Sequence, residues 1–169
     1  MKRVVTAAIG MPLALAAVFL LPPWGFFLLV AVIVELAAAE YVTLNRMWAS
    51  RAPLGALLVM APLAALALAA AGGSSLSPTI SWGLVLAAAA LTSVGVGGVV
   101  LLARTPLDEA VAAIGALSFG IPYFALPIAS LYLLQRQDSW LVLLLLIVVW
   151  LGDTAAFCCG SALGRHKMA

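Results

Sequence analysis

Long apolar runs, separated by short polar breaks, dominate the sequence. A helix needs about 20 apolar residues to cross the core of a lipid bilayer. Six runs reach or approach this length, and they cover residues 4–21, 24–44, 54–71, 80–103, 110–134 and 139–163. The breaks hold proline, glycine or charged residues, as at Pro22 and Pro23 between the first two runs. The pattern therefore predicts about six transmembrane helices.

The runs are apolar on every side. A helix of a water-soluble protein carries a polar stripe with a period of about 3.6 residues. A strand of a membrane barrel alternates between apolar and polar positions, and no stretch of the sequence does so. Because backbone polar groups in lipid must be paired internally, the runs favour helices. We therefore expect an all-α, polytopic integral membrane bundle that forms a single membrane domain over residues 1–169.

The composition restricts the function further. Hydrophobic residues make up 66% of the chain and charged residues 8%, whereas soluble domains contain roughly 45–50% and about 25%. So few charges cannot cover a water-exposed surface, which excludes a soluble domain, a disordered chain and a nucleic-acid binder. The adjacent Cys158 and Cys159 fit neither an ordinary disulfide nor a metal-site spacing, and we interpret them as small apolar helix residues.

The basic residues predict an orientation. With a cytoplasmic N-terminus and six alternating spans, seven of the eight lysines and arginines lie on the cytoplasmic side, and only Arg136 lies outside. Trp24, Trp82 and Trp140 each begin a run at the outer boundary, where tryptophan is enriched. The first run is long enough to be an uncleaved span rather than a signal peptide. We expect a multi-pass protein of the cytoplasmic (inner) membrane with both termini in the cytoplasm.

Several acidic residues need an explanation in a membrane. Asp108 and Glu109 form a pair at a predicted helix start, where acids interact favourably with the helix dipole. Glu40 lies close enough to the two arginines that follow its run to form a structural ion pair. Glu35 lies in the middle of the same run, where a charge costs on the order of 2.5–3.5 kcal/mol. Glu35 is therefore a candidate intramembrane polar site, with a structural and a functional role both open.

Asp153 is the most informative acidic residue, because it follows an uninterrupted apolar stretch near the cytoplasmic end of the last run. Small residues recur every four positions around it and would let another helix approach closely; they are Gly152, Ala156, Gly160 and Gly164. A basic cluster then follows at Arg165, His166 and Lys167. An acid and a basic cluster at one water boundary can hold a divalent cation together with phosphate groups. The alternative is a helix-end aspartate beside an ordinary positive anchor.

At these residues the chain resembles the phosphatidate cytidylyltransferases, also called CDP-diacylglycerol synthases. The similarity is densest over residues 118–167, and it includes Ser-Phe-Gly-Ile-Pro-Tyr at 118–123, Asp-Thr-Ala-Ala-Phe at 153–157 and the segment 160–167. Weaker similarity covers the rest of the chain, at Lys2, Arg3, Pro22, Pro23, Trp24, Glu40 and Tyr41.

Two departures from the family pattern matter. Ala155 and Phe157 stand where the family typically has glycine and tyrosine. The family continues with a Ser-Pro-Lys-Lys-Thr segment and later with a signature rich in lysine, aspartate, histidine and glycine, neither of which precedes Ala169. We therefore expect the N-terminal portion of a longer enzyme, and the activity of this chain by itself stays open, a truncated and inactive form included.

The resemblance implies transfer of a cytidylyl group from CTP to phosphatidic acid, giving CDP-diacylglycerol and pyrophosphate in phospholipid biosynthesis, with Mg²⁺ as the cofactor. It implies that Asp153 is the catalytic residue and metal ligand, and that Arg165, His166 and Lys167 bind substrate phosphates. The expected partners are CTP, phosphatidic acid and membrane lipids, with a homodimer left open and no nucleic acid.

Two other functions are compatible with these residues. A transporter or channel module would use Glu35 and Asp153 as ion-coupling acids, but such folds are built from internal repeats. The two three-span halves share neither breaks nor acid positions. A non-catalytic membrane scaffold would instead pair with another subunit through its glycine and alanine faces.

Overall fold

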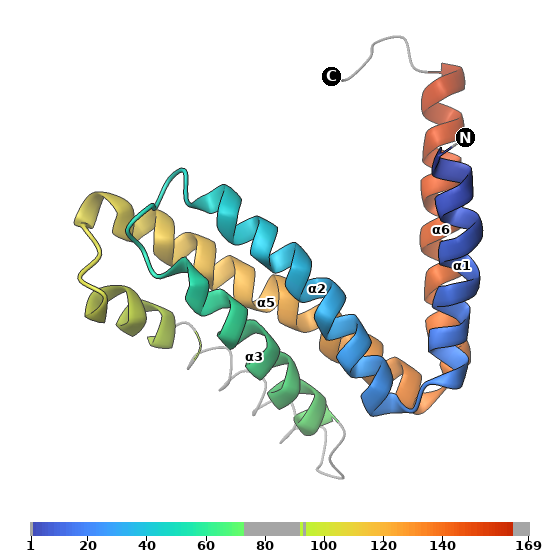
Figure 1. The fold of residues 1–169 in the computed structure, drawn as a ribbon, viewed down its shortest axis with the longest axis horizontal. Helices are drawn as coiled ribbons and strands as arrows, with labels where there is room; N and C mark the ends of the chain where they lie inside the picture. The colour runs from blue at the N-terminus through green and yellow to red at the C-terminus, as the bar shows by residue number, and fades with distance from the viewer. Residues whose placement is uncertain (1, 73–91, 93, 164–169) are drawn as a thin grey trace. The chain divides into compact units, whose positions relative to one another are not determined.

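The computed structural model describes the backbone of residues 2–72, 92 and 94–163, and the side chains of residues 10–72, 92 and 94–160. In this part of the chain every regular element is a helix and no strand occurs, which confirms the predicted all-α class (Figure 1). The elements are α1 (Lys2–Leu20), α2 (Pro23–Asn45), the short 3₁₀ helix η1 (Leu54–Ala56), α3 (Leu57–Gly72), α5 (Leu107–Gln137) and α6 (Ser139–Leu163), and residues 94–102 are also helical.

Four of the described helical segments are long and apolar enough to cross a membrane. They are Pro23–Asn45, Leu54–Gly72, Leu107–Gln137 and Ser139–Gly160. A shorter apolar helix, Gly10–Leu20, lies within α1. Most of the predicted run at residues 80–103 lies outside the described residues. The membrane bundle is thus supported, while the total of six spans stays a prediction.

Local chemistry explains where the helices begin and end. Pro22 has an extended backbone, with φ −64° and ψ 156°, and Pro23 opens α2 at a position whose N–H has no helical partner. At α5, the helix is longer than the predicted run of residues 110–134, because it begins directly after Pro106. Asp108 and Glu109 fall in its first turn, as expected for acids at the positive end of a helix dipole.

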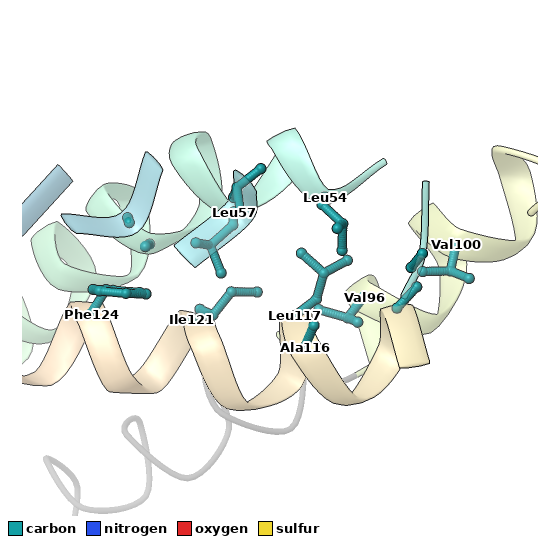
Figure 2. Packing of buried hydrophobic residues seen from close by; sticks show 13 residues of the cluster. Leu54, Leu57, Val96, Val100, Ala116, Leu117, Ile121 and Phe124 are labelled. Atoms are coloured by element: carbon teal, nitrogen blue, oxygen red, sulfur yellow. The ribbon is translucent and has the colours of Figure 1, made fainter. Parts of the chain in front are cut away.

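The structure divides into two compact units, and the larger one covers Pro22–Leu133. Its main core lies between α2, η1, α3, α5 and the helical residues 94–102. Figure 2 shows Leu117, Ile121 and Phe124 of α5 turned toward Leu54 and Leu57, all of which are buried. Of the three long apolar helices that contribute to this unit, 44% of the apolar stretch of α5 is buried, against 22% for α2 and 28% for η1 and α3 together, so α5 is the helix around which this unit packs.

A second cluster of buried side chains lies in the same unit, and it contains two aromatic rings. Phe27 and Tyr132 meet edge to face with ring centroids 5.5 Å apart, and Trp24 lies 5.1 Å from Tyr132. Alanines fill the rest, because small side chains allow helices to approach closely; they are Ala65, Ala69 and Ala125, together with Ile128.

The smaller unit combines Met1–Leu21 with Leu134–Ala169, and α1 packs against α6 within it. Phe19 and Trp140 meet edge to face with ring centroids 5.2 Å apart. Asp138 begins α6 by accepting a hydrogen bond from the backbone N–H of Trp140 at 3.0 Å. The prediction of one membrane domain over residues 1–169 is not tested by this division.

Candidate functional site

Asp153 lies on α6 in a stretch where every residue from Leu151 to Gly160 is exposed. The next residue, Thr154, donates its hydroxyl to the backbone carbonyl of Trp150 at 2.7 Å. The Thr154 hydroxyl is therefore used within the helix itself. Asp153 is the charged residue of this exposed stretch, and its carboxylate is accessible to a ligand.

The small-residue face beside Asp153 is open. A Cβ atom built on Gly152 or on Gly160 would meet no atom within 4 Å. Ala156, between them, is exposed. The two glycine positions therefore leave room for another helix to approach this face closely.

The basic cluster predicted to act with Asp153, at Arg165, His166 and Lys167, lies outside the described residues. Its role as a phosphate-binding group stays a prediction. The described residues contain no group of three acidic, histidine or cysteine side chains that could hold a metal ion. Mg²⁺ is often bound by only one or two carboxylates together with substrate phosphates. Asp153 thus fits the role of one ligand, and the described residues do not complete a cation site.

Glu35 is the second predicted polar position, and its surroundings are different. Both carboxylate oxygens are buried, and neither has a hydrogen-bond partner among the described residues. The neighbouring Val34 contacts both core clusters, so Glu35 lies in α2 at the level where the two clusters meet. A carboxyl group without a partner at this depth is costly in either ionisation state. Glu35 is thus a half-buried residue whose carboxylate oxygens are both enclosed in the larger unit.

The predicted ion pair of Glu40 is wrong. Glu40 is exposed, and no ion pair joins it to Arg46 or Arg51, all three of which lie in the described part. It belongs instead to a shallow hollow of about 390 Å³ on α2, lined by Ala39, Glu40, Thr43 and Leu44. Arg46 caps the C-terminus of α2, where a positive charge interacts favourably with the helix dipole.

Glu109 has a role that the sequence did not reveal. Its carboxylate accepts hydrogen bonds from the backbone N–H of Arg51 at 2.8 Å and from the hydroxyl of Ser50 at 3.3 Å. The bonds bridge 58 and 59 residues of sequence and hold the connection between α2 and η1 against the start of α5. From the sequence, the position of Glu109 at a helix start predicts only a favourable interaction with the helix dipole.

Gln135 was also missed, because the sequence placed it in a polar break after residue 134. It is a buried residue of α5, and its side-chain amide donates to the carbonyls of Val18 at 3.0 Å and Leu21 at 3.1 Å. These bonds satisfy carbonyls at the C-terminal end of α1, which have no partner within that helix. Gln135 is therefore a structural residue, and only its long-range contacts reveal this.

The family model described as "Cytidylyltransferase family" matches residues 1–169 of the chain. No curated protein matches the sequence, and no solved structure matches the fold.

Proposed function

Because the chain belongs to the cytidylyltransferase family, as the match over residues 1–169 shows, we propose that it acts on a membrane lipid. The proposed reaction transfers the cytidylyl group of CTP to phosphatidic acid and gives CDP-diacylglycerol and pyrophosphate. The proposed location is the cytoplasmic membrane, with Asp153 near the cytoplasmic surface.

One observation carries the choice of a lipid substrate. The family uses CTP, and four described helices of this member are long and apolar enough to span a membrane. An acceptor that remains in the bilayer would need an enzyme that reaches both the lipid phosphate and the water-soluble nucleotide. A phosphate-bearing lipid such as phosphatidic acid meets that requirement.

The reaction needs no covalent enzyme intermediate. A phosphate oxygen of the lipid attacks the α-phosphorus of CTP, and the bond between the α-phosphorus and the bridging oxygen breaks to release pyrophosphate. Catalysis of such a transfer is mainly positioning and charge stabilisation. In the proposal Arg165, His166 and Lys167 hold the phosphates of the two substrates, and Asp153 orients the site at the helix end.

We propose that Mg²⁺ is required and that Asp153 supplies one of its oxygen ligands. When bound, Mg²⁺ would neutralise phosphate charge during the transfer. Glu35 is proposed as a separate polar position within the bundle, away from the reacting phosphates.

The test compares membranes that contain the chain, alone and joined to the C-terminal portion of a family enzyme. Both are supplied with phosphatidic acid, Mg²⁺ and radiolabelled CTP, and lipid-soluble label is measured. The expected result is label in CDP-diacylglycerol, lost on Asp153→Asn by at least about 100-fold, the effect of removing one main charge-stabilising group.

Asp138→Asn is the matched control, because asparagine keeps the oxygen that accepts from Trp140 at the start of α6. It should leave the transfer unchanged. Full transfer by the Asp153→Asn protein would contradict the role of Asp153, while no transfer in either format would contradict the proposed reaction.

A further inference from the structure

The connection between α2 and η1, residues 46–53, forms a loop with a fixed backbone. Ala49 and Leu54, within and just after the loop, are 1% and 2% exposed and belong to the main core cluster. Glu109 of α5 accepts hydrogen bonds from the Arg51 backbone and the Ser50 hydroxyl. The loop is therefore fixed by the burial of Ala49 and Leu54 in the core and by its hydrogen bonds to the Glu109 carboxylate.

The outer surface of the same loop is basic and apolar. Arg46 and Arg51 are exposed, and between them Met47 is 81% and Trp48 76% exposed. Trp side chains and basic residues together are typical of the boundary between the bilayer core and the headgroups. The loop follows the last residue of an apolar helix and precedes another, which gives it that position.

A third arginine lies at this end of the larger unit. Arg104 is exposed and has a φ of 51°, in the connection between the helical residues 94–102 and α5. Val100, four residues before Arg104, lies in the same core cluster as Ala49. In Figure 1 the 46–53 loop, the end of residues 94–102 and the start of α5 gather at one end of this unit.

No ion pair joins Arg46, Arg51 or Arg104 to a carboxylate within the described part of the chain. The carboxylate of Glu109, which contacts the loop, accepts its hydrogen bonds from neutral donors of the loop. Three exposed guanidinium groups without acidic partners form a surface suited to an anionic ligand, because arginine pairs with phosphate oxygens through two parallel hydrogen bonds.

We propose that Arg46, Arg51 and Arg104 form a binding surface for the phosphate groups of anionic phospholipids in the surrounding bilayer. Arginine near a membrane surface attracts anionic lipid, and Met47 and Trp48 give the same surface an apolar side that fits acyl chains. Glu109 is a positioning residue, because it fixes the loop that carries two of the arginines. The proposal does not depend on the transferase reaction.

The test measures lipid binding to the purified full chain in a neutral detergent by native mass spectrometry. Short-chain phosphatidylglycerol is the probe, and short-chain phosphatidylcholine is the neutral reference. Wild-type protein should prefer phosphatidylglycerol. Arg46→Gln and Arg51→Gln should each weaken its binding about fivefold, as expected for one charge at a membrane surface. Arg136→Gln, an exposed arginine at the other end of α5, should have no effect.

Glu109 gives the sharpest comparison, because charge alone and loop positioning predict opposite results. Glu109→Ala removes a negative charge, so simple electrostatics predicts stronger binding of phosphatidylglycerol. If the loop must be held in place, the same change weakens binding. Asp108→Ala removes the neighbouring charge, which contributes no side-chain hydrogen bond among the described residues, and should leave binding equal or stronger.

Three results would overturn the arginine surface, and a fourth would overturn the role of Glu109. Equal binding of phosphatidylglycerol and phosphatidylcholine would exclude a preference for anionic lipid. An effect of Arg136→Gln as large as that of Arg46→Gln would show that binding follows net charge and has no location. Displacement of phosphatidylglycerol by CTP would assign the arginines to the nucleotide. Stronger binding by the Glu109→Ala protein would overturn the positioning role of Glu109.

Discussion

Replacing Gly120 by alanine tests the packing at the centre of the larger unit. A Cβ atom on Gly120 would lie 2.5 Å from Cδ1 of Leu57 and 3.0 Å from Cε1 of Tyr41. Leu57 has no exposed surface, and the Tyr41 hydroxyl donates to the carbonyl of Ala116 at 3.0 Å. Neither neighbour can move away without losing its own contacts, so we expect Gly120→Ala to be destabilising.

The size of the effect follows from two opposing contributions. Forcing an extra methyl group into a packed core typically costs about 1–3 kcal/mol. Alanine is about 1 kcal/mol more favourable than glycine inside a helix. Gly115→Ala, in the same helix, provides the control, because its Cβ would meet nothing within 4 Å. Its stability should stay equal or rise, so the two variants should differ by about 1–3 kcal/mol.

The assay is reversible unfolding of the detergent-solubilised chain by sodium dodecyl sulfate, followed by tryptophan fluorescence. The free energy of unfolding is compared for wild type, Gly120→Ala and Gly115→Ala. Leu57→Ala, added to Gly120→Ala, should cost less than it does in wild type, because it removes the clashing atoms. Equal stability of the two glycine variants would refute the close approach of α5 to α3 and α2.

Three further predictions concern polar groups and the cation. Gln135→Leu should lower the free energy of unfolding by about 1–3 kcal/mol, since two carbonyls of the α1 end lose their donor, whereas Gln137→Leu at an exposed position should be neutral in the same unfolding assay. Glu35→Leu should raise the free energy of unfolding by about 1–3 kcal/mol, because it removes a buried carboxyl without a partner. Glu40→Leu, at an exposed position, should not raise it. A Glu35→Leu protein less stable than wild type would mean that Glu35 has a partner. Chelation of Mg²⁺ with EDTA should abolish CDP-diacylglycerol synthesis, and added Mg²⁺ should restore it; synthesis that persists in EDTA would contradict the cation requirement.

The hydrophobic pattern of the sequence is sufficient to predict the helices but not the contacts between them. The two prolines after α1 and the acids at the start of α5 determine helix ends through local backbone chemistry, so the sequence predicts them. The end of α5 was placed too early because Gln135 is polar, and polarity alone cannot distinguish a break from a buried residue with distant partners. Its acceptors lie 114 and 117 positions away.

In the candidate site, too, the sequence predicts the residues but not their contacts. Asp153 and Glu35 stand out because each is an acid in an apolar run. The structure describes Asp153 as exposed and the two carboxylate oxygens of Glu35 as buried. The hydrogen bonds of Glu109 to the 46–53 loop, and the missing ion pair of Glu40, depend on which faces of α2 and α5 meet. Helices that are apolar on all sides carry no stripe that would indicate those faces.

The central claim, that this member of the cytidylyltransferase family acts on a lipid phosphate, is tested most directly by following the two ends of the CTP triphosphate. Membranes that contain the chain, alone and joined to the C-terminal portion of a family enzyme, receive phosphatidic acid and CTP labelled at either the α- or the γ-phosphorus. We predict that the α label enters the lipid phase only when phosphatidic acid is present, and that the γ label leaves as pyrophosphate. Absence of α label from the lipid in both formats, or γ label in the lipid, would contradict the claim.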